Sequence, residues 1–290
     1  MLPAGLSSCP PAKDRDKRSA RSEQGEEMKI ATWNINGVKA RIDNLTQWLK
    51  DSDPDIVCLQ EIKTVDEGFP RLEIEALGYH VETHGQKGFN GVAILSKNSP
   101  FEVNRGLPGD PLDEQARFLE AAFTLSDTRI LRVCCLYLPN GNPVETEKYP
   151  YKLAWMERLR TFAAERLAYE EMLVLAGDYN VIPEPHDCFD PKVWENDALF
   201  LPQTREAFRR LENLGLTDAL RATTDATQLY SFWDYQAGAW PKNNGIRIDH
   251  LLLSPEAADR MTSAAIEKHV RAWEKPSDHV PVIAYFDFAG

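Results

Sequence analysis

The sequence has no long apolar segment: none of its 290 residues lies in an uninterrupted apolar run that could cross a membrane as a helix. Such a crossing needs about 20 apolar residues, so we expect no membrane-spanning segment. The first 27 residues also lack the apolar centre of a signal peptide and are rich in Lys, Arg, Glu, Ser and Pro. A segment of this composition buries too little apolar surface to offset the entropy of ordering, so we expect residues 1–27 to form a disordered tail.

The cysteines lack any regular spacing. The chain contains five, with no C-x-x-C pair and no Cys and His cluster that has the spacing of zinc ligands. This argues against a disulfide framework and against zinc. An odd, unpatterned set of thiols is typical of a reducing compartment, so we expect a cytoplasmic protein.

The chain also lacks an excess of positive charge, because its formal net charge at pH 7 is −12. Proteins that bind nucleic acids usually carry a positive field, so this value argues at first against such a partner. Overall charge sets the distant field, however, whereas phosphate binding depends on local groups and on any bound cation. A nucleic-acid partner is therefore not excluded.

Apolar runs and amphipathic stretches alternate along the rest of the chain. Periodicity predicts helices at residues 42–50, 152–169 and 204–214, and strands at residues 30–34, 55–60, 91–96, 118–125, 130–138, 172–176, 248–254 and 280–286. No repeat or Pro/Gly linker divides them, so we predict one α/β domain, residues 28–290, with helices packed outside paired sheets. Residues 182–202 are rich in Pro and Asp without periodicity, which predicts a functional surface loop.

Polar side chains stand where the predicted apolar strands end. They occur at six strand ends and are Asn34, Asn36, Gln60, Glu61, Tyr137, Asn140, Asp178, Asn180, Asp249, Asp278 and His279. A single acid at a strand end is usually a turn or capping residue. Strand ends in an α/β sheet can lie side by side, however, so six such positions together predict one shared pocket.

Phosphoester hydrolysis is the chemistry that needs this set of groups. The negative phosphate repels a nucleophile, so a hard cation must neutralise the developing charge. Mg²⁺ prefers oxygen ligands, and Glu61 is the best candidate, followed by Asp278. Asp178 suits the positioning or deprotonation of the attacking water. His279 can donate to a phosphate oxygen, with Asp249 keeping it charged and oriented.

Six sequence blocks also resemble the exonuclease III family of AP endonucleases, within the endonuclease–exonuclease–phosphatase superfamily. They are T-W-N-I-N-G (32–37), D-I-V-C-L-Q-E-I-K (55–63), Y-L-P-N-G (137–141), G-D-Y-N (177–180), N-N-G-I-R-I-D-H-L-L-L-S (243–254) and S-D-H (277–279). The blocks follow one another in the family's order, and the resemblance runs from residue 28 to about residue 286. One block alone is weak evidence, whereas six in order make a specific match.

The resemblance implies a DNase I-like four-layer α/β sandwich, in which two packed mixed sheets are flanked by helices. It places Asn34, Glu61 and Asp278 at a Mg²⁺ ion, for which Mn²⁺ could substitute, and any second ion at Asp178 and Asn180. It also implies that Tyr137 contacts the phosphate, that Asp178 and Asn180 hold the attacking water, and that Asp249 holds His279 on the phosphate.

The same resemblance suggests how DNA would be held. Phe232 and Trp233 could stack on a base or fill the gap beside a flipped sugar. Alternation places them on opposite faces if the segment is extended, so we expect one of the two to be a core aromatic residue. The family places residues that line the abasic pocket at the positions of Ile246 and Ile248. The expected polar contacts to DNA are Asn140, Lys148 and Arg247, and Lys152, Lys242 and Lys275 are further cations that could contact phosphates. Each of these five cations could equally be an ordinary solvated charge.

The predicted function is that of a DNA-repair phosphodiesterase with AP endonuclease and 3′-5′ exonuclease or 3′-end trimming activity. Its partner would be double-stranded DNA with abasic sites or 3′ termini. We expect a monomer that needs no protein partner and no membrane. Through DNA, it would be associated with the nucleoid. Residues 218–221 read D-A-L-R, whereas the family's second signature has a hydroxyl and an aromatic residue there. The alternatives are a phosphodiesterase of the same fold acting on a small or lipid substrate, and a non-catalytic DNA-binding protein.

Overall fold

The computed structural model describes residues 27–125 and 128–288 of the chain. The predicted tail, residues 1–27, lies outside these ranges except for Glu27. That residue opens the first strand, β1 (Glu27–Asn34), so this strand begins one position before the predicted start of the domain.

Twelve strands form two sheets of six. The first sheet has the order β11 (Met261–Ile266), β12 (Val282–Asp287), β1, β2 (Ile56–Gln60), β4 (Val92–Ser96) and β3 (His80–His84). The second has the order β5 (Glu102–Arg105), β6 (Phe118–Thr124), β7 (Ile130–Tyr137), β8 (Met172–Asp178), β10 (Asp249–Leu253) and β9 (Thr217–Asp218). The pairs β1–β2 and β7–β8 are parallel and the other neighbours are antiparallel, so both sheets are mixed.

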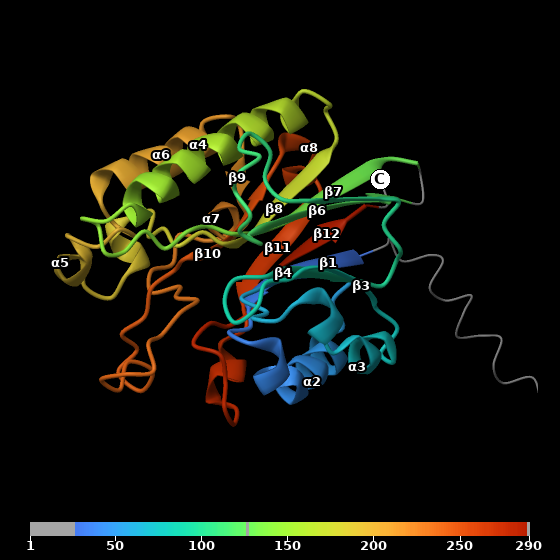
Figure 1. Cartoon of the computed structure of the whole chain (residues 1–290), viewed down its shortest axis with the longest axis horizontal. Coiled ribbons are helices and arrows are strands. Elements are labelled where there is room, and N and C mark those ends of the chain that lie inside the picture. The colour runs from blue at the N-terminus through green and yellow to red at the C-terminus, as the bar shows by residue number, and fades with distance from the viewer. Residues whose placement is uncertain (1–26, 126–127, 289–290) are drawn as a thin grey trace, which may run out of the picture.

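Helices cover the outer faces of the two sheets (Figure 1). The first sheet is flanked by α2 (Ile42–Ser52) and α3 (Arg71–Glu75), and the second by α4 (Lys148–Leu167) and α6 (Pro202–Glu212). Short helical turns complete the fold: η1 (Val38–Arg41), η2 (Asp66–Gly68), η3 (Pro185–Asp187), α5 (Pro191–Trp194), α7 (Ala219–Thr223), α8 (Pro255–Ala258) and η4 (Lys268–Ala272). The predicted four-layer α/β sandwich is confirmed.

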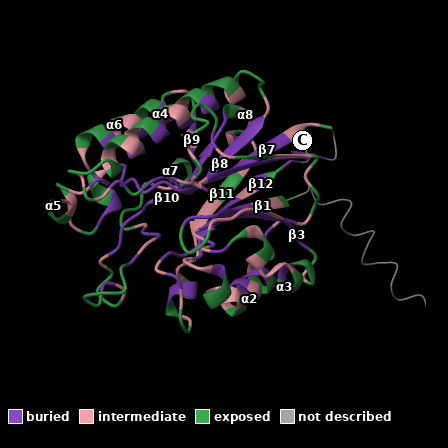
Figure 2. Cartoon of the chain, in the orientation of Figure 1, coloured by how far each residue is buried: buried purple, intermediate pink, exposed green. Residues whose placement is uncertain are grey.

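The continuous apolar runs of the central strands follow from this layering. In β2, Ile56 and Cys58 face the second sheet, whereas Val57 and Leu59 face the helices. Successive side chains of a strand point to opposite faces, so a strand that is covered on both faces must be apolar throughout. Figure 2 shows the result, with buried strands at the centre and helices whose outer surfaces are exposed.

The structure corrects several predicted elements. Helix α4 begins four residues before and ends two residues before the predicted helix at 152–169, and α6 begins at Pro202 rather than at residue 204. Residues 182–202 are not irregular throughout, because they contain η3 and α5. Four strands were not predicted, namely β3, β5, β9 and β11. No helix among the described residues is long and apolar enough to span a membrane.

The pairing of the strands places the predicted polar residues at one end of both sheets. In the first sheet, β12 runs antiparallel to β1 with Thr32 opposite Val282, so the residues that precede β12 lie beside the end of β1. In the second sheet, Asp178 lies opposite both Tyr137 and Asp249. Because the sheets pack face to face, the two sets of strand ends meet.

Candidate active site

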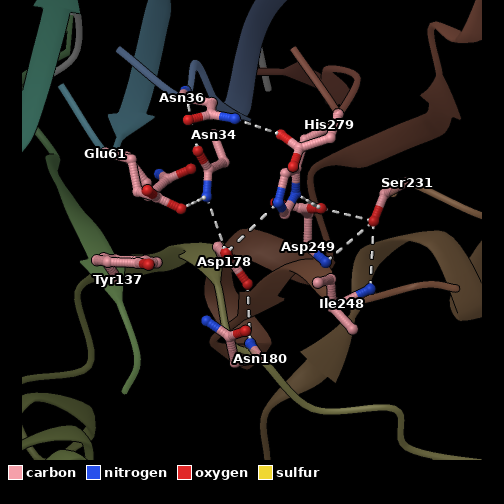
Figure 3. A network of polar contacts seen from close by, with 12 residues as sticks. Asn34, Asn36, Glu61, Tyr137, Asp178, Asn180, Ser231, Ile248, Asp249 and His279 are labelled. Carbon is pink, nitrogen blue, oxygen red and sulfur yellow. Dashed lines mark hydrogen bonds and ion pairs between the residues drawn. The ribbon is translucent and has the colours of Figure 1, made fainter. Parts of the chain in front are cut away.

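A chain of hydrogen bonds joins the strand ends of the two sheets (Figure 3). The side-chain amide of Asn34, at the end of β1, donates to Glu61 Oε1 at 2.9 Å and to Asp178 Oδ2 at 3.0 Å. The same oxygen of Asp178 lies 3.8 Å from His279 Nε2. Asn34 therefore stands between two carboxylates from different sheets and keeps them apart.

The His279 ring is held from its other side. Its Nδ1 lies 2.8 Å from Asp249 Oδ2, and the Ser231 hydroxyl donates to that same oxygen at 2.6 Å. The backbone N–H groups of Ile248 and Asp249 donate in turn to the Ser231 hydroxyl, at 3.2 and 3.1 Å. The edge of the Phe232 ring packs against His279 with ring centroids 4.9 Å apart. This arrangement fixes the ring so that Nε2 faces Asp178.

The pKa values of His279 and Asp178 are both raised, for different reasons. Burial alone would lower the pKa of His279, but the charge and hydrogen bond of Asp249, with the charges of Asp178 and Asp278, raise it to about 10. Burial raises the pKa of Asp178 to about 7, against the attraction of the His279 cation. The site thus pairs a persistent imidazolium with a carboxylate that can accept a proton near neutral pH, as general base catalysis requires.

Asp178, at the end of β8 in the second sheet, is held by residues of the two loops that follow β7 and β8. The Asn180 N–H donates to Asp178 Oδ1 at 2.9 Å, and Asn180 adopts the left-handed conformation with a φ of 48°. Its side chain accepts from Asn140 Nδ2 at 3.1 Å and donates to the Leu138 carbonyl at 3.0 Å. Left-handed backbone at a residue other than glycine is strained, and such residues cluster at functional sites.

Glu61 and Asp278 supply oxygen ligands beside this group. Glu61 follows β2 with a φ of 50°, and its Oε2 pairs with Lys63 Nζ at 2.8 Å. Asn36 links the two acids, because its side-chain amide donates to Asp278 Oδ1 at 2.9 Å and its oxygen accepts from Lys63 at 2.5 Å. Although burial opposes it, hydrogen bonds from Lys63 and Asn34 lower the pKa of Glu61. Carboxylate and amide oxygens are the donors that a hard cation such as Mg²⁺ takes, so this set fits the predicted metal.

A second group of acids in the site is less suited to a metal. Potential ligand atoms of Asp178, Asp249 and His279 lie within 4.8 Å of one another. However, His279 Nδ1 and Asp249 Oδ2 are bonded to each other, and Asp249 Oδ2 also accepts from Ser231. These bonds leave Asp249 and His279 with fewer free ligand atoms than Glu61 and Asp278 offer.

Tyr137 lies at the end of β7 beside Glu61 and Asp178. Burial, followed by the negative charges of these two acids, raises the pKa of the phenol well above its ordinary value. The guanidinium of Arg117 lies 4.8 Å from the ring centroid. Tyr137 thus remains a neutral hydroxyl group that can donate to a phosphate oxygen.

Two predicted DNA contacts are corrected by burial. Trp233 is 0% exposed and packs in the core outside the first sheet, with its Nε1 bonded to Asn243 Oδ1 at 3.2 Å. Arg247 is 2% exposed, and its guanidinium bonds to Asp187 and Asp218. Neither side chain can touch DNA in this structure. Phe232, the neighbour of Trp233, is half-buried and remains a candidate contact.

Ile246, Ile248 and Lys152 are also buried, contrary to their predicted roles. The two isoleucines are 1% and 3% exposed and pack in a small apolar cluster with residues of the 182–202 segment. Lys152 is 0% exposed and donates to two backbone carbonyls, so it does not bind phosphate. Asn140, Lys148, Lys242 and Lys275 are exposed, and their contacts with DNA remain predictions.

Several residues that order the site were not singled out from the sequence. They are Lys63, Arg117, Ser231 and Ser277, whose hydroxyl donates to the Asn34 carbonyl at 2.7 Å. Lys63 and Ser277 lie inside the sequence blocks that indicated the site, so closeness to a block was an available signal. Ser231 directly precedes Phe232 and Trp233, which the sequence did indicate, whereas Arg117 stands before β6, outside every sequence block.

The fold and the site define a class of protein, namely hydrolases of phosphate esters built on two packed sheets. Comparison with known proteins then gives the family. The model of the Endonuclease/Exonuclease/phosphatase family matches residues 31–279, and the chain belongs to this family.

Relatives were found both by sequence and by structure. Exodeoxyribonuclease III from Haemophilus influenzae is 37% identical over 267 residues, which cover 89% of this chain and 100% of that protein. An AP endonuclease structure from Archaeoglobus fulgidus matches with a TM-score of 0.84 and 38% identity, covering 90% of this chain and 99% of that one. The 3′ phosphatase NExo from Neisseria, bound to a product DNA hairpin, matches with a TM-score of 0.86 and 38% identity, covering 90% and 100%.

These matches confirm the predicted family resemblance and enzyme class. The chain is a DNA-repair nuclease that hydrolyses phosphodiester bonds. The family is one of metal-dependent nucleases, and the described residues include acidic groups that could hold a metal.

Proposed function

We propose that this nuclease cuts double-stranded DNA at abasic sites and removes blocking groups or nucleotides from 3′ ends, with Mg²⁺ as the metal. The observation that carries the proposal is the position of Asp178. It is a buried carboxylate between the Asn34 amide and the His279 imidazolium, beside oxygen ligands from the other sheet. This arrangement provides a base, a cationic donor and a metal site around a single phosphate.

In the proposed reaction, Asp178 accepts a proton from the water that attacks phosphorus. The bond from phosphorus to the 3′ oxygen breaks, which yields a 5′ phosphate and, after the leaving oxygen is protonated, a 3′ hydroxyl. His279 and Tyr137 donate hydrogen bonds to the phosphate oxygens, where negative charge develops. Asn180 holds the water against Asp178.

Glu61 and Asp278, with Asn34, are the residues that would hold the metal. When bound, Mg²⁺ or its substitute Mn²⁺ neutralises charge on the phosphate. A second ion, if the enzyme uses one, would take Asp178 and Asn180.

DNA as the substrate is supported by the relatives' names and by the relative that is bound to a DNA hairpin. In this chain, Phe232 is placed to pack beside a sugar or base, since its ring lies against His279. Asn140 and Lys148 are exposed on the second sheet's side of the site and would contact phosphates.

We also propose that the enzyme is one catalytic domain that begins near residue 28 and works as a monomer in the cytoplasm. The support for a monomer is that Asn34, Asp178, Asp249 and His279 contact one another within the chain. The four cysteines among the described residues are buried and free, as suits a reducing compartment.

The test is the cutting of a duplex with one stable abasic-site analogue, next to an undamaged duplex with a recessed 3′ end. We expect cutting 5′ to the lesion and shortening of the 3′ end in Mg²⁺, and less than about 1% of either rate in EDTA, because the metal supplies several kcal/mol of charge stabilisation. No cutting of either duplex by folded protein, with turnover of a small or lipid phosphodiester, would contradict the proposal.

A further inference from the structure

Lys152 is a buried cation that the proposed reaction leaves without a role. It projects from the first turns of α4 and is 0% exposed. Its Nζ donates to the carbonyl oxygen of Asn140 at 3.0 Å and to that of Asn180 at 2.6 Å. It forms no ion pair with a carboxylate of residues 27–125 or 128–288, although a buried charge is ordinarily paired.

Gly141 leaves space for the Lys152 side chain beside the loop that follows β7. Gly141 has a φ of 92°, and a Cβ at that position would lie 2.7 Å from Lys152 Cδ. The loop after β7 therefore passes directly over the lysine stem. Burial lowers the pKa of Lys152 to about 7, and the charges of Asp178 and Asp197 oppose this shift. Both forms of the amine have at least two N–H bonds, so the two bonds to carbonyls do not depend on its charge.

The two carbonyls belong to the loops that position Asp178. One loop follows β7 and the other follows β8, and the side chains of Asn140 and Asn180 meet between them at 3.1 Å. Asn180 then holds Asp178 Oδ1 through its N–H at 2.9 Å, from a strained left-handed conformation. No other described side chain is bonded to both carbonyls, so Lys152 joins the backbones of the two loops in addition to the bond between the Asn140 and Asn180 side chains.

We propose that Lys152 is a positioning residue that clamps the loops after β7 and β8, and thereby sets Asn140 and Asn180 relative to Asp178 and the attacking water. This role rests on the proposed function of Asp178 and Asn180. Lys152 does not touch the substrate, because it is buried beneath the loops. Its contribution is to the rate of the chemical step rather than to DNA affinity.

The test begins with Lys152→Met, which keeps the length of the side chain and removes both hydrogen bonds. We expect the single-turnover rate of cutting to fall about 10- to 100-fold, since small misplacements of reacting groups have effects of this size. The dissociation constant for the abasic duplex in EDTA is expected to stay within about twofold, because no contact with DNA is lost. Lys152→Gln, which can reach one carbonyl as a neutral donor, is expected to recover part of the rate.

A second experiment, in an Asn180→Ala variant, distinguishes a positioning role of Lys152 from a general loss of protein stability. In an Asn180→Ala enzyme, adding Lys152→Met is expected to lower the rate less than about threefold, because residues that act through one another are not additive. Met156→Ala is the matched control. It lies one turn further along α4, in the core beneath the second sheet. It is expected to lower the melting temperature without changing the rate of the folded enzyme.

The outcomes distinguish the two proposals. Two results would overturn the clamp alone. In the first, the wild type is active and Lys152→Met cuts DNA at the same rate. In the second, Lys152→Met lowers the rate of the Asn180→Ala enzyme by the same factor as it lowers the wild-type rate. A wild type that cuts no DNA would overturn the proposed function and the clamp with it. If Lys152→Met does not yield folded protein, Lys152→Gln is measured in the same two backgrounds and decides by the same criteria.

Discussion

Replacement of Asp178 by Asn is expected to lower the single-turnover rate of DNA cutting about 1,000-fold or more, because general base catalysis contributes effects of this size. Asn has the same shape but cannot accept a proton from water. The substitution also removes a buried negative charge near Asp249, so we expect a melting temperature equal to or above that of the wild type. DNA affinity measured in EDTA is expected to be kept.

Asp113→Asn is the control for this substitution. The Asp113 side chain is 6% exposed and bonds to Tyr151 and Arg158, outside the site. This variant should lose stability while retaining its rate of cutting. A folded Asp178→Asn enzyme with wild-type activity would show that another group activates the water.

Arg247→Met is expected to lower the free energy of unfolding by about 3–5 kcal/mol, because it leaves buried Asp218 without its guanidinium partner and buried Asp187 with Arg221 alone. Arg247 is 2% exposed, with Nε 2.8 Å from Asp187 Oδ1 and Nη1 2.5 Å from Asp218 Oδ2. Asp187 belongs to the 182–202 segment, Asp218 belongs to β9, and Arg247 lies two residues before Asp249, where β10 begins. The two ion pairs therefore connect these three parts of the chain. Urea unfolding followed by fluorescence measures the change.

Arg221→Met offers a matched comparison. Arg221 also pairs with Asp187, but its side chain is 20% exposed and Asp187 would keep Arg247. We expect a loss of only about 1–2 kcal/mol. Equal losses for the two variants would contradict the central role of Arg247.

The pH dependence of the free energy of unfolding gives a second check on the pairing of Arg247 with Asp187 and Asp218. Burial alone would raise the pKa of Asp187 and Asp218, but the charge of Arg247 lowers both. A carboxyl with a lowered pKa in the folded state contributes stability above its unfolded pKa of about 3.9, and that stability is lost as pH falls. The gap in stability between wild type and Arg247→Met should therefore be full at neutral pH and should narrow from about pH 5 downward.

The central strands could be predicted from sequence because burial on both faces requires apolar residues throughout, as in β2 and β8. The four strands that were missed, β3, β5, β9 and β11, all lie at the edges of their sheets. Edge strands are partly exposed, so polar residues replace the apolar run, as in the H-V-E-T-H sequence of β3. Their pairing depends on neighbours that are distant in sequence.

The convergence of the candidate site residues could be predicted because these residues stand at strand ends, where a polar residue interrupts an apolar run. Asp178 and Glu61 are visible in this way, and the sheets bring them together. The roles of Arg247, Trp233 and Lys152 could not be predicted, because a local pattern cannot tell a buried cation or indole from an exposed one. Each is buried by contacts with segments far along the chain, for example Arg247 by Asp187 and Lys152 by Asn180.

We propose that the site has a metal side and a water side, and Mn²⁺ soaked into crystals would show where the metal binds. The anomalous signal of the ion gives its position without relying on activity. We predict a peak bound by Glu61 and Asp278, which leaves Asp178 and His279 to face the water and the phosphate. A peak held by Asp249 and His279, with none at Glu61 and Asp278, would contradict the assignment.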